Sequence, residues 1–110
     1  MAYRFVRATP KHDRMAELHE RVERGDVERL DPFGRAMTRA LKRARFDADA
    51  GEAVWVEEDY CSPPLAMERE AVLDDYFEDL TVVDADVDEA DGWARIEGLP
   101  SLWDRVLSDA

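Results

Sequence analysis

The repeat of apolar residues changes several times along this chain of 110 residues, between the two-residue period of strands and the 3.6-residue period of helices. Each predicted helix begins at or beside a proline, a residue that the first turn of a helix tolerates. The pattern predicts the order β-α-α-β-α-β-β-α, with strands over residues 3–7, 53–57, 80–87 and 93–97, and helices over residues 10–25, 32–46, 62–77 and 100–107.

This element order constrains the fold class. A chain of this length forms one domain, and its apolar fraction of 45% suffices for one core. The pair Asp91-Gly92 lies between the last two predicted strands and favours a hairpin turn. We therefore predict a single α+β domain over residues 1–110, with helices packed on a small mixed sheet.

The composition is typical of proteins adapted to molar salt. The chain has no Asn and no Gln, 13 of its 15 basic residues are Arg, and its formal net charge is −12. An acidic surface keeps a protein soluble where concentrated salt screens repulsion. We predict a halophilic protein whose negative charge is mostly adaptation rather than a functional signal.

Several classes of protein are excluded by simple counts. No apolar run approaches the 18 residues of a membrane-spanning helix, and the first residues lack the apolar core of a signal peptide. One cysteine cannot form an intrachain disulfide. We expect a cytoplasmic protein in a reducing compartment, without membrane association.

The charge is divided unequally along the chain. Residues 1–45 hold 12 basic and 7 acidic residues, whereas residues 46–110 hold 3 basic and 20 acidic residues. One interpretation is that the basic half packs near the acidic half, within one domain or across a homodimer. The alternative is that the basic half forms a surface for a phosphate-bearing partner.

The predicted helix over residues 32–46 is basic and amphipathic. Its candidate anion-binding residues lie opposite the apolar stripe and are Arg35, Arg39, Lys42 and Arg43. Phosphate contacts weaken steeply with salt. A strongly acidic protein in molar salt would gain little from them, so we expect no nucleic-acid partner.

Cys61 is the candidate nucleophile, because a thiol beside a helix N-terminus has a lowered pKa. The string Tyr60-Cys61-Ser62-Pro63-Pro64 resembles the strand–Cys-x-Pro-x–helix element of thioredoxin-like redox proteins, and residues 98–102 resemble their cis-proline loop. Pro64 stands where the second cysteine of that family would be, and only ten residues follow Pro100. We therefore assign no family, and we favour a buried structural cysteine over a reactive thiol at this position.

Arg69 is the one basic residue of its predicted helix, where it falls among apolar positions. Either its head pairs with an acid while its stem covers the sheet, or it anchors an anionic ligand or partner.

The sequence predicts no metal site and no cofactor. His12 and His19 are seven residues apart, a poor spacing for a shared ion. Asp84-x-Asp86-x-Asp88 and Asp47-x-Asp49 begin like calcium loops but lack the required glycine at position 6. No glycine-rich phosphate loop is present.

Three hypotheses about function remain. The first is a non-enzymatic interaction or accessory module that binds a protein partner or self-associates, through the basic helix or through Trp55, Trp93 and Trp103. The second is a small thiol enzyme or redox protein that uses Cys61. The third is anion or nucleic-acid binding by the basic helix. We favour the first, because the sequence contains no catalytic constellation.

Overall fold

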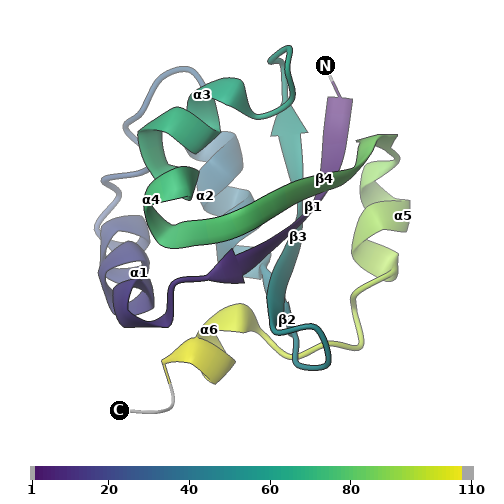
Figure 1. Cartoon of the computed structure of the whole chain (residues 1–110). Helices are drawn as coiled ribbons and strands as arrows, with labels where there is room; N and C mark the ends of the chain where they lie inside the picture. Colours follow the sequence, from purple (N-terminus) through teal and green to yellow (C-terminus); the bar gives the residue numbers. More distant parts are fainter. Residues whose placement is uncertain (1, 108–110) are drawn as a thin grey trace.

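A four-stranded antiparallel sheet with the order β2-β3-β1-β4 organises the chain (Figure 1). The computed structural model describes residues 2–107. The strands are β1 (Ala2–Pro10), β2 (Arg45–Asp47), β3 (Glu52–Asp59) and β4 (Phe77–Val87). β1 lies between β3 and β4, so Val6 is paired with Trp55 on one side and Val82 on the other.

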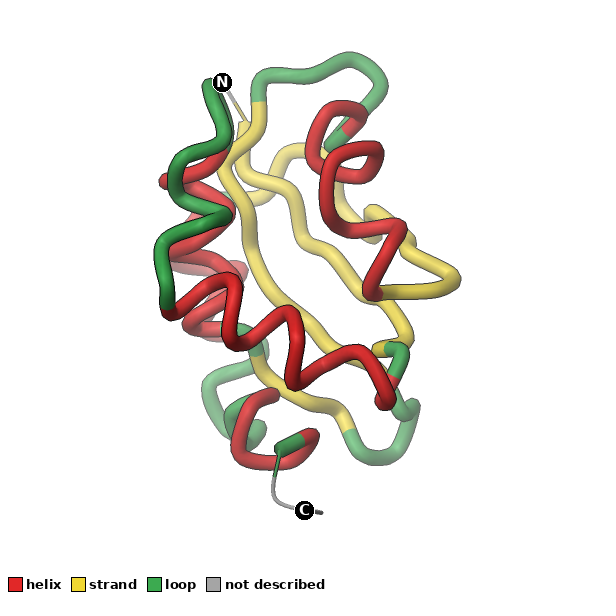
Figure 2. The backbone as a smooth tube through the Cα atoms, turned by 90° about the vertical axis from the view of Figure 1, so that its left-hand side faces the viewer, coloured by secondary structure: helices red, strands yellow, loops and turns green. Residues whose placement is uncertain are grey.

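Helices cover the sheet unequally. Figures 1 and 2 show most of the helices gathered on one side of the strands, whereas α5 lies on the other side and α6 lies near β2. The helical segments are η1 (His12–Arg14), α1 (Met15–Glu23), α2 (Gly34–Arg43), α3 (Ala66–Glu68), the π turn η2 (Arg69–Leu73), α4 (Asp74–Tyr76), α5 (Glu89–Ala94) and α6 (Leu102–Val106).

The core has two layers because strand side chains alternate between the faces of the sheet. Val6, Ala8 and Trp55 belong to the larger layer, which also contains the apolar faces of α1, α2 and the α3–α4 segment. Phe5 and Val56 belong to a smaller layer, where they pack with three further residues, Val54, Val87 and Ile96.

The predicted α+β class is confirmed, and the sheet is antiparallel rather than mixed. The predicted strand over residues 93–97 is wrong. Asp88 caps a helix there by accepting a hydrogen bond from the amide of Asp91 at 3.1 Å, so Asp91-Gly92 lies inside α5 instead of forming a hairpin turn. β4 pairs with β1 instead.

Other boundaries differ by a few residues. The predicted helix over residues 32–46 ends at Arg43, and the residues after it form β2 against β3. The amide of Phe46 donates to the carbonyl of Pro100 at 2.9 Å, and the amide of Leu102 donates to the carbonyl of Ala44 at 2.9 Å. These long-range bonds compete with continuation of the helix.

Ion pairs join the basic and acidic halves of the chain within one domain. Arg4 pairs with Asp59 at 3.0 Å, and Arg7 pairs with Asp47 at 3.0 Å and with Glu52 at 3.3 Å. This agrees with the first interpretation of the divided charge. Among the described residues, no helix combines the length and apolarity that crossing a bilayer requires.

Candidate functional site

A pocket of about 390 Å³ lies between the first half of α2 and the segment that follows β3. α2 packs against β3, and the chain leaves β3 at Asp59 and turns into α3. The lining residues are Pro32, Phe33, Arg35, Ala36, Arg39, Glu58, Asp59, Tyr60, Cys61, Met67 and Glu68. The pocket therefore brings together three site residues predicted from the sequence, namely Arg35 and Arg39 of α2 and Cys61 of the loop after β3.

Asp59 is a buried residue of the pocket lining that holds the surrounding backbone by hydrogen bonds. Its carboxylate accepts hydrogen bonds from the amide of Leu65 at 2.7 Å, the amide of Cys61 at 3.0 Å and Nε of Arg4 at 3.0 Å. Burial raises the pKa of Asp59, but these bonds outweigh it and hold the pKa below its ordinary value. Asp59 is therefore an ionised group whose hydrogen bonds fix the start of the β3–α3 loop.

Arg4 of β1 belongs to the same hydrogen-bond network as Asp59. Its guanidinium also donates to the carbonyl of Cys61 at 3.0 Å and to the carbonyl of Ala85 on β4. One side chain thus ties β1 to β4 and to the loop that carries Cys61.

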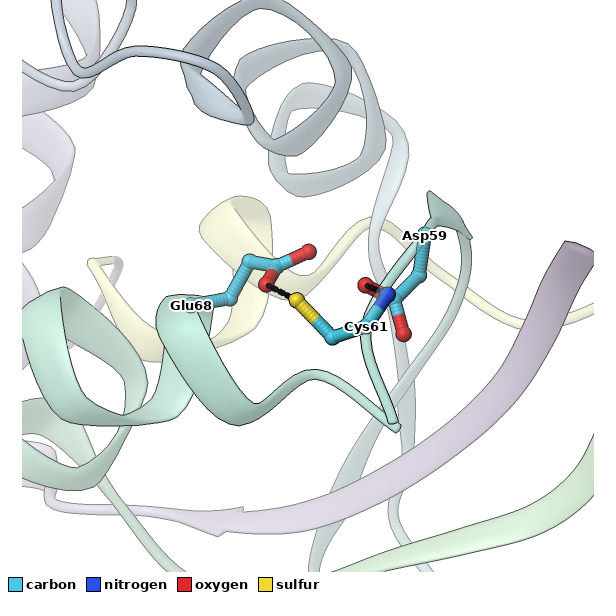
Figure 3. Close-up of side chains that lie close together, drawn as sticks. All are labelled: Asp59, Cys61 and Glu68. Atoms are coloured by element: carbon cyan, nitrogen blue, oxygen red, sulfur yellow. Dashed lines mark hydrogen bonds between the residues drawn. The ribbon is translucent and has the colours of Figure 1, made fainter. Parts of the chain in front are cut away.

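Cys61 lies in negative surroundings. Its Sγ donates to Oε1 of Glu68 at 3.6 Å, and Figure 3 shows Glu68 reaching from α3 toward this sulfur. The backbone amide of Met67 lowers the pKa of Cys61, but burial and the charges of Glu68 and Asp59 together raise it by more. The predicted activation by a helix N-terminus is therefore outweighed, and the neutral thiol is favoured.

Two further carboxyl groups are buried nearby. Burial raises the pKa of Glu68 to about 7, and burial raises the pKa of Glu57 to about 8. Glu57 Oε1 accepts a hydrogen bond from Nε1 of Trp55 at 2.9 Å, whereas Oε2 has no partner within residues 2–107. Both carboxyls are therefore largely protonated near neutral pH or just below it.

The remaining candidates of the basic helix lie away from this pocket. Lys42 and Arg43 line a second pocket of about 370 Å³, which Arg39 also borders, together with Glu58 and Glu89. The guanidinium of Arg43 lies 4.1 Å from the ring centre of Trp93. The four predicted cations thus line two neighbouring pockets, with Arg39 in both, and each pocket also contains acids.

Arg69 pairs with Asp74, its Nε lying 3.1 Å from Oδ1. The π turn explains this pairing, because it places residues five apart one above the other. The sequence interpretation that the head of Arg69 pairs with an acid therefore holds, on an exposed surface of the molecule.

The two histidines lie in different places. His12 lies edge-on to Phe46 with ring centres 6.4 Å apart, and His19 lies against Trp103 at 5.2 Å. In the two aspartate-rich runs, side chains accept hydrogen bonds from nearby backbone amides. Asp47 accepts from the amides of Asp49 and Ala50. Asp84 likewise accepts from the amide of Asp86.

The two segments with a thioredoxin-like pattern lie at opposite ends of β3. Cys61 lies two residues after the end of β3, whereas the carbonyl of Leu99 accepts a hydrogen bond from Arg45 of β2, beside the start of β3. The eight residues of β3 span about 26 Å between them. The structure does not assemble these two segments into one site.

Sequence reasoning missed Glu57, Asp59 and Glu68, although a signal was present. Glu57 and Asp59 have the same strand parity as buried Trp55, so all three share one face of β3. Glu68 follows Leu65 by three residues and precedes Val72 by four, which places it on the apolar face of that helical segment.

Comparisons with protein-family models, with curated proteins and with solved structures found no match to this chain.

Proposed function

We propose that this protein is a non-enzymatic interaction module that binds a partner protein at the pocket between α2 and the β3–α3 loop. One observation carries the proposal. Among the described residues only three large hydrophobic side chains are well exposed, and two of them, Tyr60 (73%) and Met67 (45%), line this pocket. Exposed apolar groups gathered at a pocket are typical of interaction sites.

The charges at the pocket favour an acidic partner segment. Arg35 makes no ion pair within residues 2–107, and Arg39 is 3.8 Å from the Glu58 carboxylate, a long ion pair between exposed groups. Both guanidinium groups keep capacity for a further carboxylate. Because concentrated salt screens charges beyond contact distance, the apolar lining supplies the affinity and the arginines orient the segment.

The surroundings of Cys61 support a non-enzymatic function over a thiol enzyme. Its Sγ lies beside Glu68 and Asp59, and these acids favour the unreactive thiol. The acids that line the same two pockets as the basic residues likewise speak against a continuous phosphate track.

Site-specific photo-crosslinking tests the proposal in the full chain. A photo-reactive residue is placed at Met67, and a matched one at Val83, the third exposed hydrophobic residue, on β4. Crosslinking in a high-salt cell lysate, followed by mass spectrometry, should give one predominant protein product from position 67 and not from position 83.

The charge reversals Arg35→Glu and Arg39→Glu should reduce that product roughly tenfold, consistent with the loss of charge-assisted contacts. Arg95→Glu, on the α5 side, should not reduce it. Equal products from positions 67 and 83, or a yield unaffected by reversal at positions 35 and 39, would overturn the proposal. A product that is a second copy of this chain would replace a separate partner by self-association.

A further inference from the structure

Three possible ligand atoms converge where β3 passes into α3. A carboxylate oxygen of Asp59, the Sγ of Cys61 and a carboxylate oxygen of Glu68 all lie within 4.8 Å of one another. The side chains come from the end of β3, the loop after it and α3, as Figure 3 shows. Two ligands of one tetrahedral zinc ion lie roughly 3.6 Å apart. Small side-chain rotations are therefore sufficient to bring these three atoms onto one ion.

A divalent ion can take the place of the protons that neutralise the buried acids of this cluster. Asp59 and Glu68 are each 1% exposed, and Glu57 is fully buried. Arg4 supplies one positive charge, and its ion pair is with Asp59. A divalent ion would balance the remaining negative charges of a Cys61 thiolate and a Glu68 carboxylate, and both protons would pass to solvent. Buried acids without such a partner cost stability.

Glu57 provides an independent observation. It projects from the same face of β3 as Asp59, two residues earlier, and the charges of Glu68 and Asp59 both act on it. Its Oε2 is buried and has no hydrogen-bond partner within residues 2–107. Buried polar groups in proteins are normally paired. A water molecule bound to an ion in this cluster would supply the missing partner.

The access from solvent and the types of ligand atom indicate which class of metal ion this cluster would bind. Asp59, Cys61 and Glu68 all line the 390 Å³ pocket, so an ion can enter from solvent and keep an open position facing the pocket. A thiolate ligand disfavours Mg²⁺ and Ca²⁺, which prefer oxygen ligands alone. We propose that Asp59, Cys61 and Glu68 form a binding site for one divalent ion of the zinc class. The ion site and the proposed partner share this pocket, but the inference does not rest on the partner, because its test uses the purified chain alone.

Cobalt is the best probe, because thiolate-bound Co²⁺ has a charge-transfer absorption that carboxylate-bound Co²⁺ lacks. The purified full chain is titrated with Co²⁺ in molar KCl, which suppresses binding to exposed acids. The absorption should saturate at one ion per chain, and Zn²⁺ should then displace the cobalt. No charge-transfer absorption at one equivalent would overturn the proposal.

Two variants separate a metal site from a structural cluster. Cys61→Ser should abolish the absorption. Glu68→Gln keeps the shape of the protonated side chain, so the fold should persist while Co²⁺ affinity falls roughly tenfold or more. Asp84→Asn with Asp86→Asn, which removes acids of β4, is the matched control and should leave affinity unchanged. Equal affinities of the wild type and Glu68→Gln would overturn the proposal, even if Cys61→Ser failed to fold.

Discussion

Trp55 and Glu57 lie two residues apart on the same face of β3, and the indole Nε1 of Trp55 donates to Oε1 of Glu57 at 2.9 Å. This hydrogen bond joins the largest buried side chain of the core to a fully buried carboxyl group. The bond lowers the pKa of Glu57, but burial outweighs it and raises the pKa to about 8. The core therefore contains a group that prefers to be protonated at neutral pH.

The first prediction concerns the pH dependence of stability in the metal-free chain. The folded chain holds a proton on Glu57 between its ordinary pKa of 4.5 and about 8, whereas the unfolded chain does not. The free energy of unfolding therefore falls as pH rises through this window, by about 1.4 kcal/mol per pH unit. Glu68, with a pKa of about 7, adds to the slope below pH 7.

Glu57→Gln should remove the part of this slope between pH 7 and pH 8, and it should be more stable than the wild type above pH 8. Denaturant unfolding at several pH values, with a chelator present, measures both effects. Glu58→Gln, the less buried neighbour, is the control and should keep the slope. A wild-type stability that rises between pH 5 and pH 8 would contradict the prediction.

The second prediction concerns Arg4. Arg4→Met leaves the buried Asp59 carboxylate without its cation, so the free energy of unfolding should fall by about 3 kcal/mol. Arg7→Met, on the same strand, removes two ion pairs whose side chains are 21–30% exposed, and should cost less than about 1 kcal/mol. Urea unfolding compares the two variants, and equal losses would refute the ranking.

The third prediction concerns Gly34 at the start of α2. A Cβ atom at this position would overlap the backbone carbonyl groups of Val27 and Glu28. Gly34→Ala should therefore destabilise the fold by about 1–3 kcal/mol through overpacking. Gly98→Ala meets no atom within 4 Å and should be nearly neutral. Thermal unfolding of both variants tests this contrast.

The fourth prediction concerns the reactivity of Cys61. Because its surroundings raise the pKa of the thiol, alkylation by iodoacetamide at pH 7 should be slower than in the unfolded chain. The rate should rise with an inflection above the ordinary pKa of cysteine. An inflection below that value would restore the thiol-enzyme hypothesis.

The fifth prediction concerns salt. Residues 46–110 carry 20 acids and 3 bases, and β4 exposes several of these acids. Screening of their mutual repulsion should raise the melting temperature between low and molar KCl. Calorimetry of the wild type measures this, and an unchanged melting temperature would refute the prediction that the chain is adapted to salt.

Elements with a regular apolar period and a clear boundary, such as β1, β3 and α2, were predicted from the sequence. The prediction failed at residues 88–97, because Asp-Gly suits both a hairpin turn and a capped helix, and only the pairing of β4 with β1 decides between them. Local patterns do not encode that long-range pairing.

The pocket was predicted only in part for a similar reason. Arg35, Arg39 and Cys61 could be selected from their own surroundings, but nothing in a linear pattern brings α2 to the end of β3. Glu57 and Glu68 were masked by the many acids of the chain, since an acidic residue on an apolar face stands out only when acids are rare.

The central position of β1 has a consequence for how the protein folds. Val6 pairs with Trp55 and Val82, which lie 49 and 76 residues further along the chain, so β1 is synthesised well before either partner. Pairings of such high sequence separation close slowly, because loop entropy is lost before contacts form. Until β4 is made, the apolar side chains of β1 have only one neighbouring strand, and during this interval the chain is most open to aggregation or to chaperone binding.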